Sequence, residues 1–507
     1  MKKKTSLFQK FLNGVEIAGN ALPHPATLFL ILALLVLFVS WLGFTLNWEV
    51  VHPGTKETIG VNNLLSDKGL HFILLKTVKN FTDFAPLGIV LVAMLGIGVA
   101  ERSGLIAAVI RVLVLSAPKK ILTFGLVFAG IISNTASDVG YVLLIPLAGI
   151  IFMAIGRHPI LGMAAAFAGV SGGFSANLAL GTIDPLLAGL SEEAAHILDP
   201  SYRVNPTANY YFMVVSTFVI SIAGTWVTER IVAPRLGEYT PHADLEQEDV
   251  HPLSAQEKKG LRWAMIIFAV FIGLLIWGII PANGILRAEN GSLLRSPVLK
   301  GIVTLLFVVA ALSGIVYGVI TKKYKNDSDV MDSMADSMKT MGTYIVLVFF
   351  AAQFVAYFKE SNLGIVAAVR GAEALKAADL NIYVLMVLFI LFAASINMLM
   401  GSASAKWAIM APVFIPIFML MGYSPELSQV VFRIGDSVTN IISPMMSFFA
   451  LIIAFFQKYD KKAGIGTIIS TMLPYSIIFF IIWSLLLIGW IEFGLQLGPG
   501  SGLYYSG

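Results

Sequence analysis

Residues 133–138 read SNTASD and residues 401–407 read GSASAKW. Both are runs of small polar residues set between long apolar blocks. Irregular backbone at membrane depth is tolerated only where it is buried in protein or lines a wet cavity. The two runs therefore predict broken helices that meet an internal cavity. Close helix packing, which small polar residues also permit, is the alternative explanation.

The composition is typical of a protein that crosses a membrane many times. Of 507 residues, 57% are hydrophobic and 13% are charged, against about 25% charged residues in soluble domains. The net charge is +4 and the basic residues fall in short loops, which favours membrane topology over nucleic-acid binding. The chain has no cysteine, which excludes disulfides and thiolate metal sites. We expect membrane lipid around the chain and no nucleic-acid partner.

The apolar blocks predict an all-α polytopic membrane protein with ordinary spans, re-entrant helical hairpins and broken helices. Blocks with spanning potential lie near residues 26–47, 86–100, 104–116, 140–156, 209–230, 262–281, 298–320, 341–358, 380–400 and 465–492. Regions 120–190 and 395–450 are the most interrupted, so we expect them to form the inner core. The basic start MKKK precedes a first transmembrane helix near 26–48, which predicts a cytoplasmic N-terminus.

Two halves of similar size flank a charged stretch. We predict a first half over 1–233, a cytoplasmic linker over 234–261 and a second half over 262–507. Landmarks recur in the same order, namely Ser133, Pro146, Pro159, Asn177 and Pro185 in the first half and Ser402, Pro416, Pro425, Asn440 and Pro444 in the second. Paired interrupted segments indicate a transporter binding site and an inverted repeat. Chance similarity in a chain rich in Gly, Ala and Pro is the alternative.

Candidate ligands in the first half lie in two places. Ser133, Asn134 and Thr135 carry neutral side-chain oxygens, which suit a hard monovalent cation such as Na⁺ or a substrate hydrogen bond. Asp184 lies in the apolar stretch GTIDPLLAGL, directly before Pro185, which predicts a break in the helix at this point. A carboxylate at membrane depth normally faces a cavity or a charged partner. We expect Asp184 to carry a proton, bind a cation or pair with a base, against the alternative of an interfacial loop residue.

The polar run of the second half supplies further candidates. Ser402 and Ser404 correspond to the first polar run and are candidate substrate ligands. Lys406 is expected to extend to the membrane interface, as lysines near helix ends do. Trp407 either belongs to an interfacial aromatic belt or stacks on a ligand beside the broken segment.

The stretch FRIGDSVTNIISPMM holds the highest density of polar candidates. Arg433 and Asp436 are three residues apart, so they are neighbours on a helix face and can neutralise each other. Asn440 lies four residues beyond Asp436 on the same face, and Pro444 ends the helix. A purely structural ion pair is the alternative to a substrate or proton site.

Five blocks resemble the AbgT family of p-aminobenzoyl-glutamate transporters. They read VKNFTDFAPLG, SNTASDVGYVLLIPL, AAAFAGVSGGFSANLALGTIDPLLAG, NMLMGSASAKWA and RIGDSVTNIISPMMSFF. The resemblance extends from LPHPATLF at 22–29 to LPYSIIFF at 473–480. It implies a homodimer whose subunits have about nine transmembrane helices and two re-entrant hairpins. It also implies transport of p-aminobenzoyl-glutamate or of p-aminobenzoate-like antimetabolites such as sulfonamides. Asp184, Trp407, Asp436 and Pro444 occupy positions where functional residues of the family fall.

The chemistry of such a substrate fits the candidate residues. Trp407 can stack on an aromatic ring, and Arg433 can hold a carboxylate. Proton coupling needs a carboxylate that alternates between wet and dry surroundings, for which Asp184 and Asp436 are the candidates. We therefore expect a proton-coupled transporter of the bacterial inner membrane that is not an enzyme and uses no cofactor. A Na⁺-coupled carboxylate transporter of the same architecture is the alternative, and import and export both remain open.

Two other classes compete with this interpretation. An intramembrane aspartyl protease would need a Gly-x-Gly-Asp block, but residues 433–436 read Arg-Ile-Gly-Asp, and Tyr459-Asp460 falls in a charged loop. A passive channel would need no titrating carboxylate. The paired carboxylates at broken helices favour a gradient-coupled transporter over both.

Overall fold

The structure is a computed structural model that describes residues 23–51, 56–115, 121–135, 140–237, 253–281, 283–288 and 296–505. Nearly all of the described chain is helical. Strands occur there as one short antiparallel hairpin, in which β1 (Glu49–Val51) pairs with β2 (Thr58–Gly60). The all-α class predicted from the apolar blocks is therefore confirmed.

The first half contains helices on both sides of the first polar run. In chain order they are α2 (Pro25–Thr45), α3 (Asp67–Thr82), α4 (Ala85–Arg102), α5 (Leu105–Leu115), α6 (Leu122–Ser133), the π-helical segment η2 (Gly140–Leu144), α7 (Ile145–Ala154), α8 (Pro159–Phe167), the π-helical segment η3 (Ala168–Gly172), α9 (Ile183–Ala195), α10 (Tyr210–Val227), the π-helical segment η4 (Thr228–Val232) and α11 (Ala233–Leu236).

The second half likewise contains helices on both sides of its polar run. Its helices are α12 (Ala255–Ile279), α13 (Pro297–Lys300), α14 (Ile302–Ile320), α15 (Asp327–Thr340), α16 (Gly342–Glu360), α17 (Leu363–Ala377), α18 (Ile382–Asn397), α19 (Ala403–Leu420), α20 (Pro425–Asn440), α21 (Phe449–Tyr459) and α22 (Ile465–Glu492). Most of the linker predicted at 234–261 lies outside the described residues.

Eight helical stretches of the described chain are long and apolar enough to cross a membrane. They are Pro25–Thr45, Asp67–Arg102, Tyr210–Leu236, Ala255–Ile279, Ile302–Ile320, Gly342–Glu360, Ala403–Leu420 and Ile465–Glu492. Four shorter apolar stretches, Leu122–Ser133, Gly140–Ala154, Pro159–Gly172 and Ile382–Asn397, flank the interruptions. The protein therefore combines full spans with helices too short to span, as the interrupted sequence blocks predict.

The order of helices around the two polar runs is the same. In the first half, α6 ends at the run, α7 and α8 follow, and a second interruption over 173–182 precedes α9. In the second half, α18 ends before the run, α19 and α20 follow, and an interruption over 441–448 precedes α21. We call four irregular segments of the described chain, 134–135, 173–182, 398–402 and 441–448, the interruptions.

Local sequence explains where the helices of these regions begin. α8 and α20 both start with a proline, whose fixed φ suits the first turn of a helix. The side chains of the preceding residues cap both helices, since His158 accepts from the Ile160 N–H and Ser424 accepts from the Leu427 N–H. Ser402 likewise accepts from the Ala405 N–H at the start of α19. The cap residues satisfy backbone donors that a helix start would otherwise leave unpaired.

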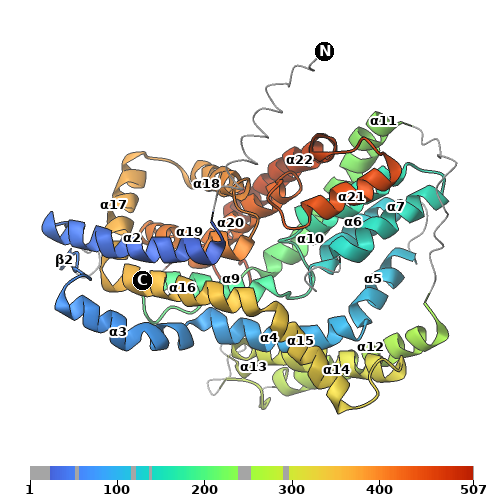
Figure 1. The fold of residues 1–507 in the computed structure, drawn as a ribbon, viewed down its shortest axis with the longest axis horizontal. Coiled ribbons are helices and arrows are strands. Elements are labelled where there is room, and N and C mark those ends of the chain that lie inside the picture. Colours follow the sequence, from blue (N-terminus) through green and yellow to red (C-terminus); the bar gives the residue numbers. More distant parts are fainter. Residues whose placement is uncertain are drawn as a thin grey trace.

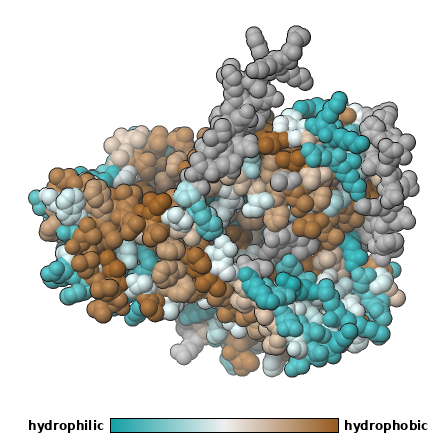
Figure 2. All heavy atoms as spheres, viewed as in Figure 1, coloured by the Kyte–Doolittle hydropathy of each residue, from teal (hydrophilic) through white to brown (hydrophobic). Residues whose placement is uncertain are grey.

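The short central helices are the most buried part of the molecule. Figure 1 shows α9, α19 and α20 in the middle of the ribbon, with α2, α3 and α17 at one end. Every residue of α20 except Thr439 is buried, although the helix carries several charged and amide side chains. Apolar residues cover much of the outer face (Figure 2), which is expected where lipid is the solvent. The fold is thus polar at its centre and apolar outside.

Candidate functional site

The two interruptions of the first half lie against each other. The Asn177 Nδ2 atom donates to Thr135 Oγ1 over 3.1 Å, so the polar run contacts the interruption before α9. Gly181 lies on the Asn134 backbone, because a Cβ at Gly181 would be 2.7 Å from the Asn134 carbonyl oxygen. Residues 136–138 of the run lie outside the described residues.

The interruptions of the second half make the same kind of contact. A Cβ at Gly401 would lie 2.0 Å from the Met445 carbonyl oxygen, so only glycine permits this approach. The Ser443 hydroxyl donates to the Asn397 carbonyl oxygen over 3.0 Å, next to Pro444, which is half-buried. In each half, the polar run therefore packs on the interruption that follows it in the sequence.

The interruptions of the two halves meet at α20. The Ser175 N–H of the first half donates to Ser437 Oγ of the second half over 3.1 Å. Asp184 at the start of α9 forms an ion pair with Arg433 of α20, with 2.7 Å between Oδ1 and Nη1. Both side chains are almost fully buried. The interruption over 173–182 and the start of α9 thus contact α20 of the second half, and charged side chains from both halves pair there.

Asp184 takes its position from the local backbone. Its Oδ2 atom accepts from the Gly181 N–H over 2.7 Å, which holds the carboxylate at the start of α9. The sequence predicted a chain break at Asp184 because Pro185 follows it. The structure places Asp184 in the first turn of the helix, so the interruption ends there. Proline at the next helical position explains the difference, because an unpaired N–H is normal in a first turn.

A second buried ion pair joins α19 and α20. Lys406 Nζ contacts Asp436 Oδ1 and also donates to Asn397 Oδ1, and the Lys406 side chain is fully buried. Asn440 Nδ2 donates to the other carboxylate oxygen of Asp436 over 3.2 Å. Asn397 at the end of α18 donates to Asn440 Oδ1 over 2.9 Å. Each polar side chain of this cluster thus has an ion-pair or hydrogen-bond partner on another helix.

The pairing differs from the sequence prediction in two respects. Arg433 and Asp436 do not neutralise each other, because Arg433 pairs with Asp184 while Asp436 pairs with Lys406. Lys406 was predicted to extend to the membrane interface, but its side chain points into the core. The physical reason is that α20 is buried on all sides. Side chains three residues apart on it therefore face different neighbouring helices, each of which supplies an opposite charge.

Trp407 lies inside the protein and not in an interfacial belt. Its side chain is fully buried, and its ring stacks on Phe432 with 4.6 Å between centroids. The indole Nε1 donates to Ser191 Oγ of α9 over 2.9 Å. Ser191 in turn donates to Gln429 Oε1 over 2.8 Å. In this conformation Phe432 therefore occupies the stacking position that the sequence analysis assigned to a ligand.

The neutral candidates of the two polar runs differ in how well they are satisfied. Ser133 Oγ donates to the Gly130 carbonyl oxygen over 2.6 Å, and Thr135 Oγ1 donates to the Ile132 carbonyl oxygen over 2.9 Å. Ser402 and Ser404 lie with their hydroxyl oxygens 3.2 Å apart. Asn134 is buried, and neither side-chain atom of its amide has a hydrogen-bond partner among the described residues. The oxygens of this run suit a monovalent cation, or a polar group of a substrate.

The ion pair of Asp184 and Arg433 is also incompletely satisfied. The contact between Nη1 and Oδ1 lacks hydrogen-bond alignment, and Arg433 Nε has no hydrogen-bond partner in the described part of the chain. Within that part, seven buried side-chain atoms lack a partner, and four of them belong to Asn134, Asp184 and Arg433. Buried polar atoms without partners are rare and call for a functional explanation. A cavity of about 10 Å³ beside Arg433 and Ser175 leaves room for about one water molecule.

Several residues of this centre were not predicted as sites. They are Lys406, Asn397, Ser191 and Gln429, which complete the hydrogen bonds of Asp436 and Trp407. Lys406 carried a usable signal, because an ionisable residue within an apolar helix is functional by default. Ser191 and Gln429 carried none, since single polar residues on a helix do not show what lies opposite them.

Comparisons with known proteins agree with this architecture. Residues 10–505 match the AbgT putative transporter family. The p-aminobenzoyl-glutamate transport protein of Escherichia coli (strain K12) is 37% identical over 492 residues, which cover 97% of this chain and 96% of that protein. Two solved structures also match over their full lengths. The YdaH transporter of Alcanivorax borkumensis, described as having an unusual topology, has a TM-score of 0.89 and 45% identity over 94% of this chain.

The second solved structure is MtrF of Neisseria gonorrhoeae, described as illuminating a class of antimetabolite efflux pumps. It has a TM-score of 0.92 and 52% identity over 97% of this chain. These relatives are transporters and not enzymes, so the protease alternative is wrong. With eight candidate spans around a buried polar centre, the chain belongs to the AbgT putative transporter family of multi-pass membrane proteins.

Proposed function

We propose that this protein is a secondary active transporter of p-aminobenzoyl-glutamate or of related p-aminobenzoate-like antimetabolites, including sulfonamides. The observation that carries the proposal is the group of buried polar atoms without partners on Asn134, Asp184 and Arg433. Asp184 and Arg433 lie where α9 of the first half contacts α20 of the second, and Asn134 lies in the polar run that packs on the interruption before α9. Irregular backbone with charged side chains at the repeat interface is typical of transporter substrate sites. The names of the family relatives supply the substrate class.

The two buried cations match the two carboxylates of an aminobenzoyl-glutamate. Arg433 and Lys406 lie on adjacent helices, and each is neutralised by one aspartate in this structure. A substrate carboxylate is a chemically equivalent partner for either cation. The polar groups of Asn134, Ser402, Ser404 and Asn440 supply neutral hydrogen bonds. Trp407 becomes a stacking surface for the ring once Phe432 moves away.

Proton coupling follows from the same exchange of partners. A proton that binds Asp184 or Asp436 removes the negative charge of the ion pair. The cation that loses its partner is then left for a substrate carboxylate, because an unpaired buried charge is unfavourable. Proton binding and substrate binding thereby favour each other. We infer that these two aspartates are the proton-coupling residues.

Sodium coupling is the second candidate, and it rests on the first polar run. Ser133, Asn134 and Thr135 bring three side-chain oxygens into one turn of chain, and the Asn134 amide oxygen has no described partner. Neutral oxygens beside broken helices are the ligands that transporters offer to Na⁺. These three residues would hold the ion in that case, and no other cofactor is expected.

The assembly and location follow from the family and the charge pattern. We infer a homodimer in the bacterial inner membrane with a cytoplasmic N-terminus. The basic residues at the start of the chain and in the loops near 322–325 and 458–462 support this orientation.

Flux into proteoliposomes tests the proposal. Labelled p-aminobenzoyl-glutamate and a labelled sulfonamide are offered under an imposed pH gradient and then under an imposed Na⁺ gradient. We expect accumulation against the substrate gradient with the pH gradient, and its loss in Asp184→Asn and Asp436→Asn. The matched control is Asp336→Asn, because Asp336 of α15 forms its ion pairs with Lys339 of the same helix and with Arg102 at the end of α4, away from the buried centre.

Each contrary outcome selects another mechanism. Accumulation that follows only the Na⁺ gradient would favour sodium coupling, and Asn134→Ala should then abolish it. Movement of substrate only down its own gradient, unchanged in both aspartate variants, would indicate a passive channel and contradict the proposal.

A further inference from the structure

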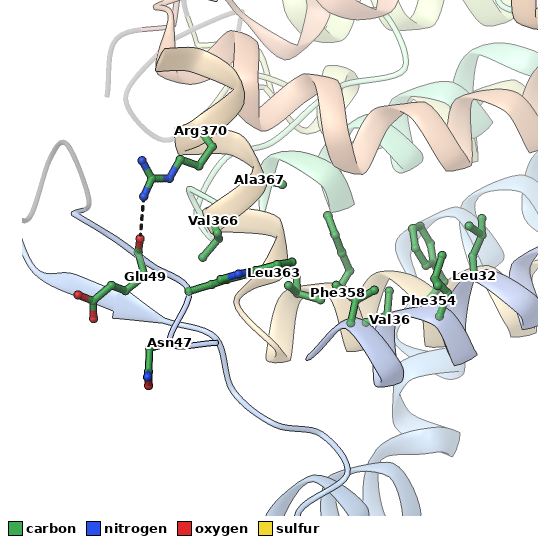
Figure 3. A pocket seen from close by; sticks show the side chains of 13 residues that line it. Leu32, Val36, Asn47, Glu49, Phe354, Phe358, Leu363, Val366, Ala367 and Arg370 are labelled. Atoms are coloured by element: carbon green, nitrogen blue, oxygen red, sulfur yellow. Dashed lines mark hydrogen bonds between the residues drawn. The ribbon is translucent and has the colours of Figure 1, made fainter. Parts of the chain in front are cut away.

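A cavity of about 710 Å³ lies between α2, α16 and α17, apart from the interruptions (Figure 3). Ligand pockets typically measure about 300–1,000 Å³. Figure 3 shows Phe354 and Phe358 of α16 near Leu32 and Val36 of α2, with Leu363 at the start of α17. None of the residues that line this cavity belongs to the candidate transport site. The apolar walls suit a hydrocarbon group.

One end of the cavity is polar and lies at a membrane boundary. α2 has 21 residues, which corresponds to about 31 Å of helix and matches the roughly 30 Å of a hydrocarbon core. Asn47 and Glu49 follow directly after this helix and line the cavity. Trp48 between them is 39% exposed, as expected of a tryptophan at the level of lipid headgroups. The apolar part of the cavity thus lies at the depth of acyl chains and the polar part at the depth of headgroups.

The polar end carries one cation whose own partners are weak. The Arg370 side chain is 68% exposed, and its Nη1 atom is 3.5 Å from Glu373 on the same helix. Its Nη2 atom donates to the Glu49 backbone oxygen over 3.4 Å, while the Glu49 carboxylate points away from Arg370 (Figure 3). Exposed pairs of this kind contribute little. The guanidinium is therefore available to an external phosphate, the anion that its geometry fits best.

We propose that this cavity binds a glycerophospholipid with an ethanolamine headgroup. One acyl chain fills the space between α2 and α16, the phosphate pairs with Arg370, and the ammonium group pairs with Glu49. Charge complementarity selects this headgroup. Glu373 lies 3.5 Å from Arg370 and Glu49 lines the same end of the cavity, so a purely anionic lipid would bring its charge toward two carboxylates. A zwitterionic headgroup places its positive end against one of them.

Native mass spectrometry of the full-length protein tests this lipid site. The protein is reconstituted in nanodiscs of equal amounts of phosphatidylethanolamine and phosphatidylglycerol and then released into detergent. We expect one retained phosphatidylethanolamine per chain. Arg370→Gln should weaken retention about five- to tenfold, because it removes one charge-assisted contact. Ala367→Phe should abolish retention by filling the cavity. Lys376→Gln is the matched control, since Lys376 lies on the same exposed helix outside the cavity.

A reversal of charge gives the sharpest test. Glu49→Lys replaces the carboxylate at the polar end of the cavity with a second cation beside Arg370. We expect this variant to retain phosphatidylglycerol in preference to phosphatidylethanolamine. The assignment fails if the unchanged protein prefers phosphatidylglycerol, or if Ala367→Phe retains as much lipid as before. It also fails if Ala367→Phe dissociates a dimer without lipid loss, because a second copy of the chain then covers the cavity. If Ala367→Phe does not fold, Arg370→Gln and Glu49→Lys decide. The result does not depend on the transport proposal, because no transport is measured.

Discussion

Four buried charged side chains define the chemistry at the centre of this protein. Asp184 pairs with Arg433, and Lys406 pairs with Asp436, with all four groups almost completely removed from solvent. Burial of an ion pair costs desolvation energy that the attraction between the charges only partly returns. Stability therefore does not explain why both pairs are present. The proposed exchange of partners with a substrate or a proton gives both pairs a role.

Removal of one member of the Asp184–Arg433 pair should lower the free energy of unfolding strongly, whereas removal of both members should lower it much less. We expect Arg433→Met to lower the free energy of unfolding by about 3–5 kcal/mol, because it leaves the Asp184 charge buried and unpaired. Asp184→Leu combined with Arg433→Met should recover most of this loss while transport stays abolished. Reversible unfolding in mixed micelles measures the stability, and proteoliposome flux measures the transport.

The control is a pair of the same kind at the surface. Lys339→Met removes one of the two cations that pair with Asp336, and because the Lys339 and Asp336 side chains are 77% and 36% exposed, the stability should hardly change. If the double variant at Asp184 and Arg433 were as unstable as Arg433→Met, the loss would come from packing and not from an unpaired charge.

Glycines hold the irregular segments against one another at the level of the helices. Gly181 contacts the Asn134 carbonyl and Gly401 contacts the Met445 carbonyl, both closer than a Cβ atom permits. The opposing atoms belong to the backbone, so they cannot move aside as the end of a flexible side chain could. The contact between the two interruptions of each half therefore depends on the absence of a side chain.

Alanine at these positions should separate the interruptions and disrupt transport. We expect Gly181→Ala and Gly401→Ala each to reduce the initial rate of flux at least about tenfold, because misplaced binding groups lose much of their effect. Gly466→Ala is the matched control, since Gly466 lies in α22 and its Cβ would meet no atom within 4 Å. Unchanged flux in Gly401→Ala would mean that this contact does not position the site.

Contact between the halves is the feature of the complete molecule that bears most directly on transport. The Ser175 N–H donates to Ser437 Oγ, so first-half and second-half segments touch beside Arg433. In alternating access, one part of a transporter moves against the other around the substrate site. A link between the halves at this place should prevent that motion.

Because the chain has no cysteine of its own, an introduced pair of cysteines can test this motion without competing thiols. The chain contains no cysteine, so the double variant Ser175→Cys and Ser437→Cys can form one disulfide within the chain. We expect oxidation of the double variant to stop flux and a reductant to restore it. Each single variant serves as a control, and both should transport equally under oxidising and reducing conditions. Full transport with the disulfide formed would show that these two segments move together.

The sequence alone determined the class of the fold, the positions of the interruptions and most of the candidate residues. Hydrophobic length, polar runs and prolines are local properties, and lipid gives the backbone no alternative hydrogen-bond partner. The proline starts of α8 and α20 are examples, because each follows from residues within one turn of helix.

The tertiary structure decided which charges pair and which way Trp407 faces. Arg433 and Asp436 are neighbours on α20, yet they pair with α9 and α19, and Trp407 is bound by Ser191 of the other half. The partner of a buried charge depends on which helix packs against it. That packing depends on contacts between residues from 30 to more than 200 positions apart, so no local pattern in the sequence contains it.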